Sequence, residues 1–405
     1  MKATLVLASA VSMASAAKQS VLTLGSQERS ILKNELDEWK AQFLDIAQAM
    51  GALPTHTESL TDVESDELQR FLDTKFQVEV ARQANPEAEF DVNNPFALLT
   101  HAEFLQMVQV SFDQSSLGLL NAVEDTTPVN VTATSADWTT SKCLSPVRNQ
   151  GSCGSCWAFS TIGAAETAHC LASGQLLDLS EQQLVSCSKN GGSMGCRGGW
   201  PQAAMDWLKD GACLESTYPY TAQTGSCSTS CAKTKLSFGQ TIKSTGEDKL
   251  ASALDSQPVS VLVESGNAVW RNYKSGVVTQ CPGGRSDHAV IAVGYDATSF
   301  KIKNSWGTSW GNGGYMTLKR GVGGKGMCNV AEAVVYPALA GDVKPTSQSP
   351  TPSTRKPFPT SPSSSTRKPF PSSSNAPIPS TTKPRHTCKP KANKGRHGSV
   401  SSSSN

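Results

Sequence analysis

The sequence predicts an α+β fold, because helix-like and strand-like segments are grouped along the chain and do not alternate as βαβ units. Residues 27 to about 125 show helical periodicity and contain no cysteine. Strand-like runs rich in valine, "PVSVLVES" (258–265) and "HAVIAVGY" (288–295), follow much later, among glycine-bounded turns. A segment rich in Ser, Thr, Pro and Lys ends the chain. We therefore expect a helical region, an α+β region and a tail.

The first 17 residues have the layout of a secretory signal peptide. "MKATLVLASAVSMASAA" combines Lys2, a short apolar run and a small-residue step at 14–16. No other stretch approaches the roughly 20 apolar residues that a membrane helix requires, so no transmembrane segment is expected. Secretion, or delivery to a lysosome or vacuole, would expose the 12 cysteines to an oxidising compartment, where disulfides are their simplest state.

Residues 18–130 are expected to form a small helical domain. One amphipathic helix is predicted by apolar residues at steps of four and three, namely Leu32, Leu36, Trp39, Phe43, Ile46 and Met50. A second is predicted by Leu68, Leu72, Phe76 and Val80. The polar, β-branched stretch "TTPVNVTATS" (126–135) predicts an exposed linker, and Asn130 within it begins an N-glycosylation motif.

The tail, residues 341–405, differs from the rest in composition and charge. It repeats "STRKPFP" at 353–359 and 365–371, and such a segment cannot bury enough apolar surface to fold. Residues 343–405 hold 11 Lys and Arg and no Asp or Glu, so the remainder carries 36 − 11 = 25 basic against 34 acidic residues. This acidic balance argues against nucleic-acid binding by the folded part, whereas the basic tail is expected to contact a cell wall or polyanionic surface.

A thiol stands at the start of a helix-like run in "NQGSCGSCWAFS" (149–160). Cys153 and Cys156 together suit a metal half-site, a redox pair, or one nucleophile beside one structural sulfur. Cys156 lies where the small-residue loop gives way to the apolar run, so the positive end of a helix dipole would favour its thiolate. Cys153 lies upstream in the loop and is better placed for a disulfide.

A thiol that performs acyl transfer needs a base, and residues 132–342 offer only His169 and His288. His169 lies 13 residues along the same helix from Cys156, about 20 Å away and on roughly the opposite face. His288, at the start of a strand-like run, remains. Asn304, in a turn between two strands, is the candidate to orient the imidazole, and Trp306 and Trp310 would shield that contact from water. Taken alone, Asn304 could equally be a simple turn former.

Three ordered segments resemble the active-site blocks of papain-like cysteine proteases. They are "QGSCGSCWAF", "DHAVIAVGY" and "KNSWGTSWGNGGY", with 132 and 148 residues from Cys156 to His288 and Asn304. The likeness extends from Asp137-Trp138 to Tyr336-Pro337 and includes "SEQQLVSC", "CRGGWP" and "STYPY". It implies a papain-like two-lobe fold over residues 131–340, with a helical lobe and a β-barrel-like lobe. The metal and redox interpretations of Cys153 and Cys156 lose weight accordingly.

The resemblance also implies a role for each matching position. Cys156 would be the nucleophile, His288 the general acid and base, and Asn304 the group that orients the imidazole. Gln150 would donate its side-chain amide to the oxyanion beside the Cys156 N–H, a contribution of typically a few kcal/mol. No cofactor and no metal is implied.

Disulfides are implied by the same comparison. The three common bridges map to Cys153–Cys196, Cys187–Cys227 and Cys281–Cys328. A cathepsin B-like bridge would join Cys143 to Cys170 and leave Cys213 for Cys231, although sequence alone does not fix connectivity. Cys388, in the tail, is left over.

The substrate cleft is implied by the "GGWP" segment and by single positions elsewhere. The bare backbone at Gly198 and Gly199 would pair with an extended substrate. The substrate-binding positions are completed by Trp200, Pro201, Leu262, Asp287, Ala289, Trp306 and Ala333. An apolar pocket with Ala333 at its base would take a bulky side chain at P2, the second residue before the scissile bond. Two alternatives stay open: a shift of one residue would put Glu332 there and admit arginine, and Leu262 and Ala333 could be ordinary core residues.

The helical region resembles the inhibitory propeptide of cathepsin L-like enzymes. "NNPFALLTHAEF" (93–104) follows the usual motif, with Leu98 where aspartate is common, and the preceding helix keeps mainly Phe71 and Asn85 of its signature. Cleavage is expected at 124–136. The short "CSKNGGSMGC" (187–196) lacks the histidine of exopeptidase relatives, which favours an endopeptidase acting on proteins and peptides. The competing hypothesis is a catalytically idle binding protein on the same fold.

Overall fold

The computed structural model describes residues 20–55, 62–108, 112, 122–129, 131–189 and 193–339. The predicted signal peptide, the predicted tail with Cys388, and Asn130 lie outside these ranges. The chain divides into two units, Met1–Pro350 and Thr351–Asn405, and all the described residues lie in the first. In the described part, no helix combines the length and the apolar composition needed to cross a membrane.

The predicted helical region is present and precedes the rest of the fold. It consists of α1 (Ser26–Ala49), α2 (Val63–Ala84), β1 (Ala88–Phe90) and α3 (His101–Val108). The apolar face predicted for the first helix is confirmed, since Leu32, Leu36 and Trp39 are buried. Glu28 in the first turn accepts a hydrogen bond from the N–H of Gly25, which caps the start of α1.

The second helix is also present, but its predicted apolar face is half wrong. Leu68 is buried, whereas Phe76 and Val80 are 51% and 50% exposed. The face that α2 buries instead includes Phe71, Thr74, Val78 and Ala81, again at steps of three and four. Thr74 can be buried because its hydroxyl donates to the Ala97 carbonyl at 2.8 Å. A polar residue therefore occupies a position on the buried face where a hydrophobic residue would be expected.

A helical lobe follows the linker. It contains α4 (Cys156–Ser173), α5 (Glu181–Cys187) and α6 (Pro201–Trp207). α4 ends at Gly174 in the left-handed conformation (φ 79°), α5 is capped by the Ser180 hydroxyl, and α6 carries proline at its first position. The structure pairs the cysteines as Cys143–Cys170, Cys153–Cys196, Cys187–Cys227, Cys213–Cys231 and Cys281–Cys328.

The strand-rich lobe is built on one mixed sheet. After β2 (Val123–Glu124) and β3 (Ala136–Asp137), its strands are β4 (Phe238–Ser244), β5 (Val259–Val263), β6 (Tyr273–Val278), β7 (His288–Tyr295), β8 (Ser299–Lys303), β9 (Tyr315–Lys319) and β10 (Val334–Leu339). Their order is β1-β6-β9-β8-β7-β5-β10-β4-β2, with β3 also on β7. Every residue of β7 is buried, as its continuous apolar run predicts. Helices α7 (Glu247–Leu254) and α8 (Ala268–Asn272) complete this lobe, and the α+β fold class is confirmed.

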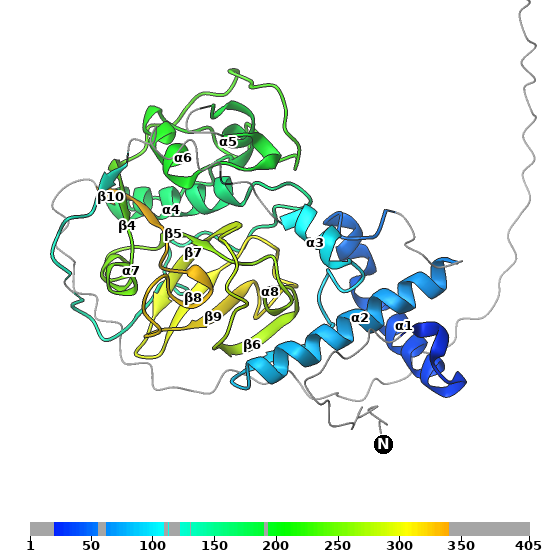
Figure 1. Cartoon of the computed structure of the whole chain (residues 1–405). Coiled ribbons are helices and arrows are strands. Elements are labelled where there is room, and N and C mark those ends of the chain that lie inside the picture. Colours follow the sequence, from blue (N-terminus) through cyan, green and yellow to red (C-terminus); the bar gives the residue numbers. More distant parts are fainter. Residues whose placement is uncertain are drawn as a thin grey trace, which may run out of the picture. The chain divides into compact units, whose positions relative to one another are not determined.

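The helical region that resembles a propeptide, called the prosegment below and covering the described residues up to 112, docks on the strand-rich lobe and shares a core with it. β1 pairs antiparallel with β6, so that Phe90 opposes Tyr273. In Figure 1, α2 lies beside α8 and β6. One continuous apolar cluster contains Phe71 and Phe104 from the prosegment together with Trp270 and Trp306 from the following domain. The prosegment is therefore an integral layer of this structure.

The linker is exposed, as predicted, yet part of it is held in place. β2 adds a short parallel strand to β4, which the sequence does not predict. Asp125 next to it forms an ion pair with Lys249 at 3.1 Å and accepts from Thr127. Those bonds hold the pKa of Asp125 below its usual value, although burial acts in the opposite direction.

Candidate active site

Cys156 is the first residue of α4, at the junction between the helical and strand-rich lobes. Its side chain is fully buried, and it is the one cysteine without a disulfide among the described residues. The N–H of Ala289 in β7 donates to Sγ at 3.3 Å. Helix and strand can approach this closely because α4 carries Gly163 opposite Ile291, whose Cδ1 a Cβ at Gly163 would meet at 2.2 Å.

His288 begins β7 and therefore directly precedes the residue that contacts the Cys156 sulfur. Its Nε2 lies 2.8 Å from Oδ1 of Asn304, the residue that follows β8. Nδ1 has no hydrogen-bond partner within the described part of the chain. Because Asn304 Oδ1 also accepts from the N–H of Ser305, the amide is held in place and the Nε2–H tautomer of the imidazole is favoured. Nδ1 is thereby left to exchange a proton with another group.

Aromatic rings surround this imidazole. Trp306 stacks on the His288 ring with 4.9 Å between centroids, and Trp270 meets it edge-on at 6.3 Å. Trp310 packs on Trp306 and Trp270. The sequence singled out Trp306 and Trp310 as a shield, but it gave no sign of Trp270, which lies in α8, some 34 residues before Asn304. Together the rings exclude water from the contact between His288 and Asn304.

Gln150 lies in the loop before α4 and is also buried. Its Nε2 donates to the Cys153 carbonyl at 3.1 Å, and its Oε1 accepts from the Ser305 hydroxyl at 2.6 Å. Its own N–H donates to the carbonyl of Ser305. The amide is thus oriented from both ends, and since Nε2 carries two protons, one remains for another acceptor.

Burial favours the neutral forms of both Cys156 and His288 in this structure. Burial raises the pKa of the Cys156 thiol to about 12, and a hydrogen bond from the Ala289 N–H offsets this only in part. Burial lowers the pKa of His288 to about 4, against the opposing effect of Asn304. Both shifts are the direction expected when charged forms lose their hydration. The chain with its prosegment docked therefore holds a thiol and an imidazole.

The cover over the sulfur comes from the prosegment. Phe112 belongs to an apolar cluster with Cys156, Trp200, Leu262 and Ala289, and the half-buried Ala333 packs against that cluster. The rings of Phe112 and Trp200 lie 5.1 Å apart. Residues that the resemblance assigns to the P2 pocket therefore meet around one aromatic side chain of the same chain. Sequence reasoning missed Phe112, because it follows the propeptide motif with no signal of its own.

The remaining substrate-binding candidates occupy different positions. The N–H of Gly198 donates to the carbonyl of Gly195, and its carbonyl accepts from the N–H of Met194. Both backbone groups of Gly198 are therefore used within the loop, so Gly199 is the better candidate to pair with a substrate backbone. A side chain at Gly199 would collide with the Trp157 ring at 2.7 Å. Pro201 is buried at the start of α6.

Two candidates have surroundings that the sequence did not indicate. The carboxylate of Asp287 accepts from Ser265 and from the N–H of Gly266, so it holds the loop before α8. Trp306 is covered by Phe96 and Phe104 of the prosegment, which meet it edge-on at 5.5 and 5.7 Å.

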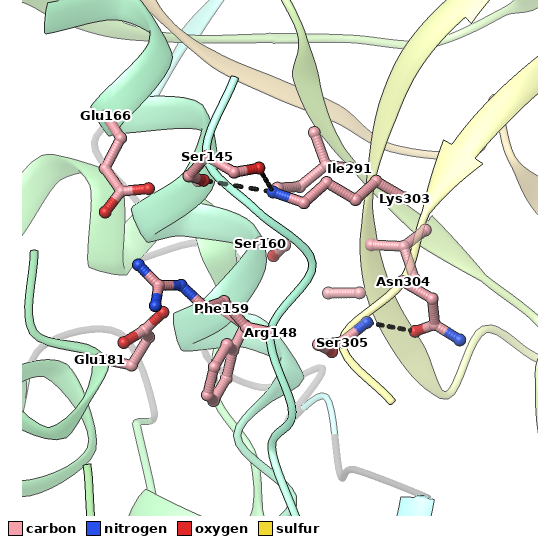
Figure 2. A pocket seen from close by; sticks show the side chains of 13 residues that line it. Ser145, Arg148, Phe159, Ser160, Glu166, Glu181, Ile291, Lys303, Asn304 and Ser305 are labelled. Atoms are coloured by element: carbon pink, nitrogen blue, oxygen red, sulfur yellow. Dashed lines mark hydrogen bonds between the residues drawn. The ribbon is translucent and has the colours of Figure 1, made fainter. Parts of the chain in front are cut away.

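A charged cluster lies directly behind the candidate site, around a cavity of about 20 Å³ (Figure 2). Lys303, next to Asn304, donates to the carbonyl and hydroxyl oxygens of Ser145 at 2.6 and 3.2 Å. Glu166 of α4 faces the same cavity and accepts from the N–H of Leu179. Burial raises the pKa of Glu166 to about 7 and lowers that of Lys303 to about 8. The cluster joins the two lobes behind His288.

His169, the rejected base, lies near the other end of α4. It is buried, and its Nδ1 accepts from the N–H of Ser237 at 2.9 Å. Among the described residues, no group of three or more His, Cys, Asp and Glu side chains gathers as a metal site.

Comparison with known proteins identifies the family. The model of "papain family cysteine protease" matches residues 132–338. Digestive cysteine proteinase 2 of Homarus americanus is 38% identical over 270 residues, which span 63% of this chain and 82% of the relative. Chymopapain of Carica papaya is 40% identical over 256 residues, 60% of this chain and 72% of the relative.

Solved structures of proforms are also similar. The proform of the ragweed pollen allergen Amb a 11, a cysteine protease, shares 25% identity with a TM-score of 0.63, covering 78% of this chain and 98% of its own. Digestive procathepsin L 3 from the larval midgut of Tenebrio molitor shares 28% identity with a TM-score of 0.60, covering 76% and 99%. These matches cover more of the chain than the peptidase domain alone, so this chain corresponds to the whole proform of such enzymes, prosegment included. The chain belongs to the papain family of cysteine proteases and is a papain-type cysteine peptidase made as a zymogen.

Proposed function

We propose that this peptidase is an endopeptidase that hydrolyses proteins and peptides through an acyl-enzyme on Cys156. The observation that carries the proposal is the junction of α4 and β7. There the Cys156 sulfur lies against Ala289, while the neighbouring imidazole is held by Asn304 through Nε2 and keeps Nδ1 without a partner among the described residues. This is the arrangement of a nucleophile, a base and an orienting group.

The proposed reaction follows from these atoms. When the prosegment leaves, water reaches the site, and the proton of Cys156 can pass to Nδ1 of His288 to give a thiolate and an imidazolium. The sulfur attacks the substrate carbonyl carbon, and the oxyanion accepts from the Cys156 N–H and from Nε2 of Gln150. The imidazolium then protonates the leaving amine as the peptide bond breaks. A water molecule, deprotonated by the imidazole, hydrolyses the thioester and restores the thiol.

The proposed P2 pocket is apolar and takes a bulky side chain. Phe112 supports this, since an aromatic ring of the chain itself packs against Trp200, Leu262 and Ala289. The Glu332 alternative is disfavoured because that carboxylate is paired with Lys325 at 2.5 Å and accepts from the Ser286 hydroxyl. A peptide library varied at P2 should show highest turnover with aromatic and large aliphatic residues. A preference for arginine would contradict this pocket assignment.

The cellular setting is proposed from the sequence and the relatives. We propose a signal peptide at 1–17, a propeptide at 18–130, a peptidase domain at 131–340 and a tail at 341–405. The protein would act outside the cell or in a lysosome or vacuole, with the basic tail in contact with a polyanionic surface. The tail charge, 11 basic and no acidic residues after position 342, supports that contact.

The experiment that tests the function is active-site titration of the processed protein with an epoxide inhibitor of thiol proteases. We expect one label per chain, on Cys156, and loss of peptide turnover in step with labelling. His288→Ala should abolish turnover, whereas His169→Ala should retain most of it, because His169 is bonded to Ser237 at the far end of α4. Absence of labelling on Cys156 would favour the competing hypothesis of a catalytically idle binding protein. Equal losses in the two variants would contradict the assignment of the base.

A further inference from the structure

The hydroxyl of Tyr220 bridges the two ends of the loop that leads to Cys156. It donates to the carbonyl of Gln150 at 2.8 Å and lies 2.6 Å from the hydroxyl of Ser155. A carbonyl can only accept, so the single phenolic proton goes to Gln150 and the Ser155 hydroxyl donates to Tyr220. One side chain thus contacts the residue that carries one proposed oxyanion donor and the residue immediately before the other.

Tyr220 is itself anchored outside this loop. Its N–H donates to the Glu215 carboxylate at 2.7 Å, and the N–H of the next residue, Thr221, donates to the Gln182 side chain. Its ring meets Phe159 of α4 edge-on, with 4.8 Å between centroids. Burial raises the pKa of its hydroxyl above the usual tyrosine range, so the bridging proton is kept at any pH at which a peptidase works. The hydroxyl is therefore a stationary point against which the loop is held.

We propose that Tyr220 is a positioning residue for the oxyanion site, acting through the loop from Gln150 to Ser155. The inference rests on the proposed function, in which the Gln150 amide and the Cys156 N–H share one oxyanion. Both donors must point at the same place when the tetrahedral intermediate forms, and a displacement of a fraction of an ångström weakens such bonds. The Gln150 amide also donates to the Cys153 carbonyl, which accepts from the N–H of Ser155 at 2.7 Å. Tyr220 is therefore a second link between the two ends of the loop, made by a side chain from outside the loop.

The chain supplies a matched control two residues away. Tyr218 belongs to the same "STYPY" segment, but its hydroxyl donates to the Ser226 carbonyl at 3.3 Å and accepts from the N–H of Ser228. Tyr220→Phe and Tyr218→Phe each delete one hydroxyl and leave the ring in place. We expect Tyr220→Phe, per titrated site, to lower kcat for an amide substrate about tenfold. This loss of kcat is smaller than the ~10²–10³-fold loss that follows deletion of an oxyanion donor, because here the donors are displaced and not removed. KM should stay within about twofold, and Tyr218→Phe should match the parent.

The second measurement separates positioning of the oxyanion from an effect on the thiol. Alkylation of Cys156 by iodoacetamide needs the thiolate but forms no oxyanion. Its rate and its pH profile should therefore be the same in the parent and in Tyr220→Phe. Ser155→Ala removes the donor to Tyr220 and a longer, 3.4 Å bond to the Cys153 carbonyl, and it should show a smaller loss of kcat with the same unchanged alkylation. This variant tests the inference if Tyr220→Phe does not fold.

Three outcomes would overturn the inference. The first is an unchanged kcat in both Tyr220→Phe and Ser155→Ala, the second is an equal loss of kcat in Tyr220→Phe and Tyr218→Phe, and the third is alkylation of Cys156 that slows as much as turnover does. If the parent enzyme takes no epoxide label, the proposed function itself fails.

Discussion

At the scale of single residues, the prosegment does more than exclude substrate from the sulfur. With Phe112 and its neighbours packed over the site, the thiol of Cys156 has a pKa of about 12 and the imidazole of His288 one of about 4. The thiolate and imidazolium that catalysis requires are therefore both disfavoured while the prosegment is docked. Burial in the zymogen thus favours the thiol and the neutral imidazole, while Phe112 covers the sulfur.

This burial predicts how acid acts on the zymogen through His288. The pKa of His288 falls from 6.5 in the unfolded chain to about 4 in the folded chain. Between these two values the unfolded chain binds a proton at this imidazole and the folded chain does not, so acid favours unfolding. Stability is complete above pH 6.5 and is lost as the pH falls towards 4. A difference of this size corresponds to about 3 kcal/mol.

The measurement compares free energies of unfolding from pH 7.5 to 4 in a Cys156→Ser zymogen, with and without His288→Gln. We expect the chain that keeps His288 to lose about 3 kcal/mol more over this range than the variant. His101→Gln, which changes an exposed histidine at the start of α3, is the control and should follow the parent. If His288→Gln has the same slope as the parent, the imidazole is not the group that acid acts on.

At the scale of secondary-structure elements, the prosegment is held by a short helix and a strand of the peptidase domain. Arg271 of α8 is 1% exposed, and its guanidinium donates to the Leu99 carbonyl at 2.9 Å, the Thr74 hydroxyl at 3.3 Å and the Gln77 side chain. All three acceptors belong to the prosegment. Just after β6, the N–H groups of Thr279 and Gln280 donate to the side-chain oxygen of Asn85 in the prosegment.

Arg271→Ala should therefore loosen the prosegment. It removes three buried hydrogen bonds from a charged donor, and each such bond contributes about 1.5–3 kcal/mol. We expect a Cys156→Ser, Arg271→Ala zymogen to be cleaved to the mature size by added active enzyme at least ten times faster than its Cys156→Ser parent. Turnover by processed Arg271→Ala enzyme should be unchanged, because Arg271 contacts no proposed catalytic group.

Lys274→Ala provides the matched control on the same segment. Lys274 pairs with Asp91 of the prosegment at 3.0 Å, but its side chain is 53% exposed, and exposed pairs contribute little. Its cleavage should stay within about twofold of the parent. Equal acceleration in both variants would mean that any lost contact opens the zymogen and that Arg271 has no special role.

The same elements explain what could be predicted from the sequence. α1 follows from its apolar periodicity, and β7 from the continuous apolar run after His288, because in these two stretches the hydrophobic residues are the buried ones. The face of α2 could not be read this way, since it buries Thr74, which is satisfied by the Ala97 carbonyl, and leaves Phe76 exposed. Its orientation is set by tertiary hydrogen bonds that leave no periodic signal.

The candidate site shows the same division. Cys156, His288 and Asn304 could be found because few residue types supply their chemistry and the motifs are specific. Tyr220, Phe112 and Arg271 could not, because their roles depend on segments distant in sequence: Tyr220 contacts residues 65 and 70 positions away, and Arg271 contacts one 172 positions away. A hydroxyl or a guanidinium has no assignable role until its acceptor is known.

At the scale of the whole molecule, the helical and strand-rich lobes are joined behind the active site by buried charges. Lys303 at the end of β8 is 4% exposed and Glu166 in α4 is 2% exposed, and Figure 2 shows both at one cavity beside Asn304. Each favours the charged form of the other, while burial opposes both charges. Arg148 and Glu181 line the same cavity, so Lys303 and Glu166 belong to a cluster of four charged side chains at the junction of the two lobes.

Replacing Lys303 alone should lower the free energy of unfolding more than replacing Lys303 and Glu166 together. Lys303→Met strands Glu166 in a buried site and should lower the free energy of unfolding of a Cys156→Ser zymogen by about 3–5 kcal/mol at pH 7. The loss should shrink in acid, where Glu166 is protonated. Adding Glu166→Met should recover much of it, since an apolar pair of similar size tolerates burial. Lys301→Met, two residues earlier in β8, removes a partly exposed ion pair with Asp137 and a hydrogen bond to Thr139, and it should cost about 1 kcal/mol or less. If Lys303→Met and Lys301→Met unfold at the same denaturant concentration, the buried charges make no special contribution to holding the two lobes together.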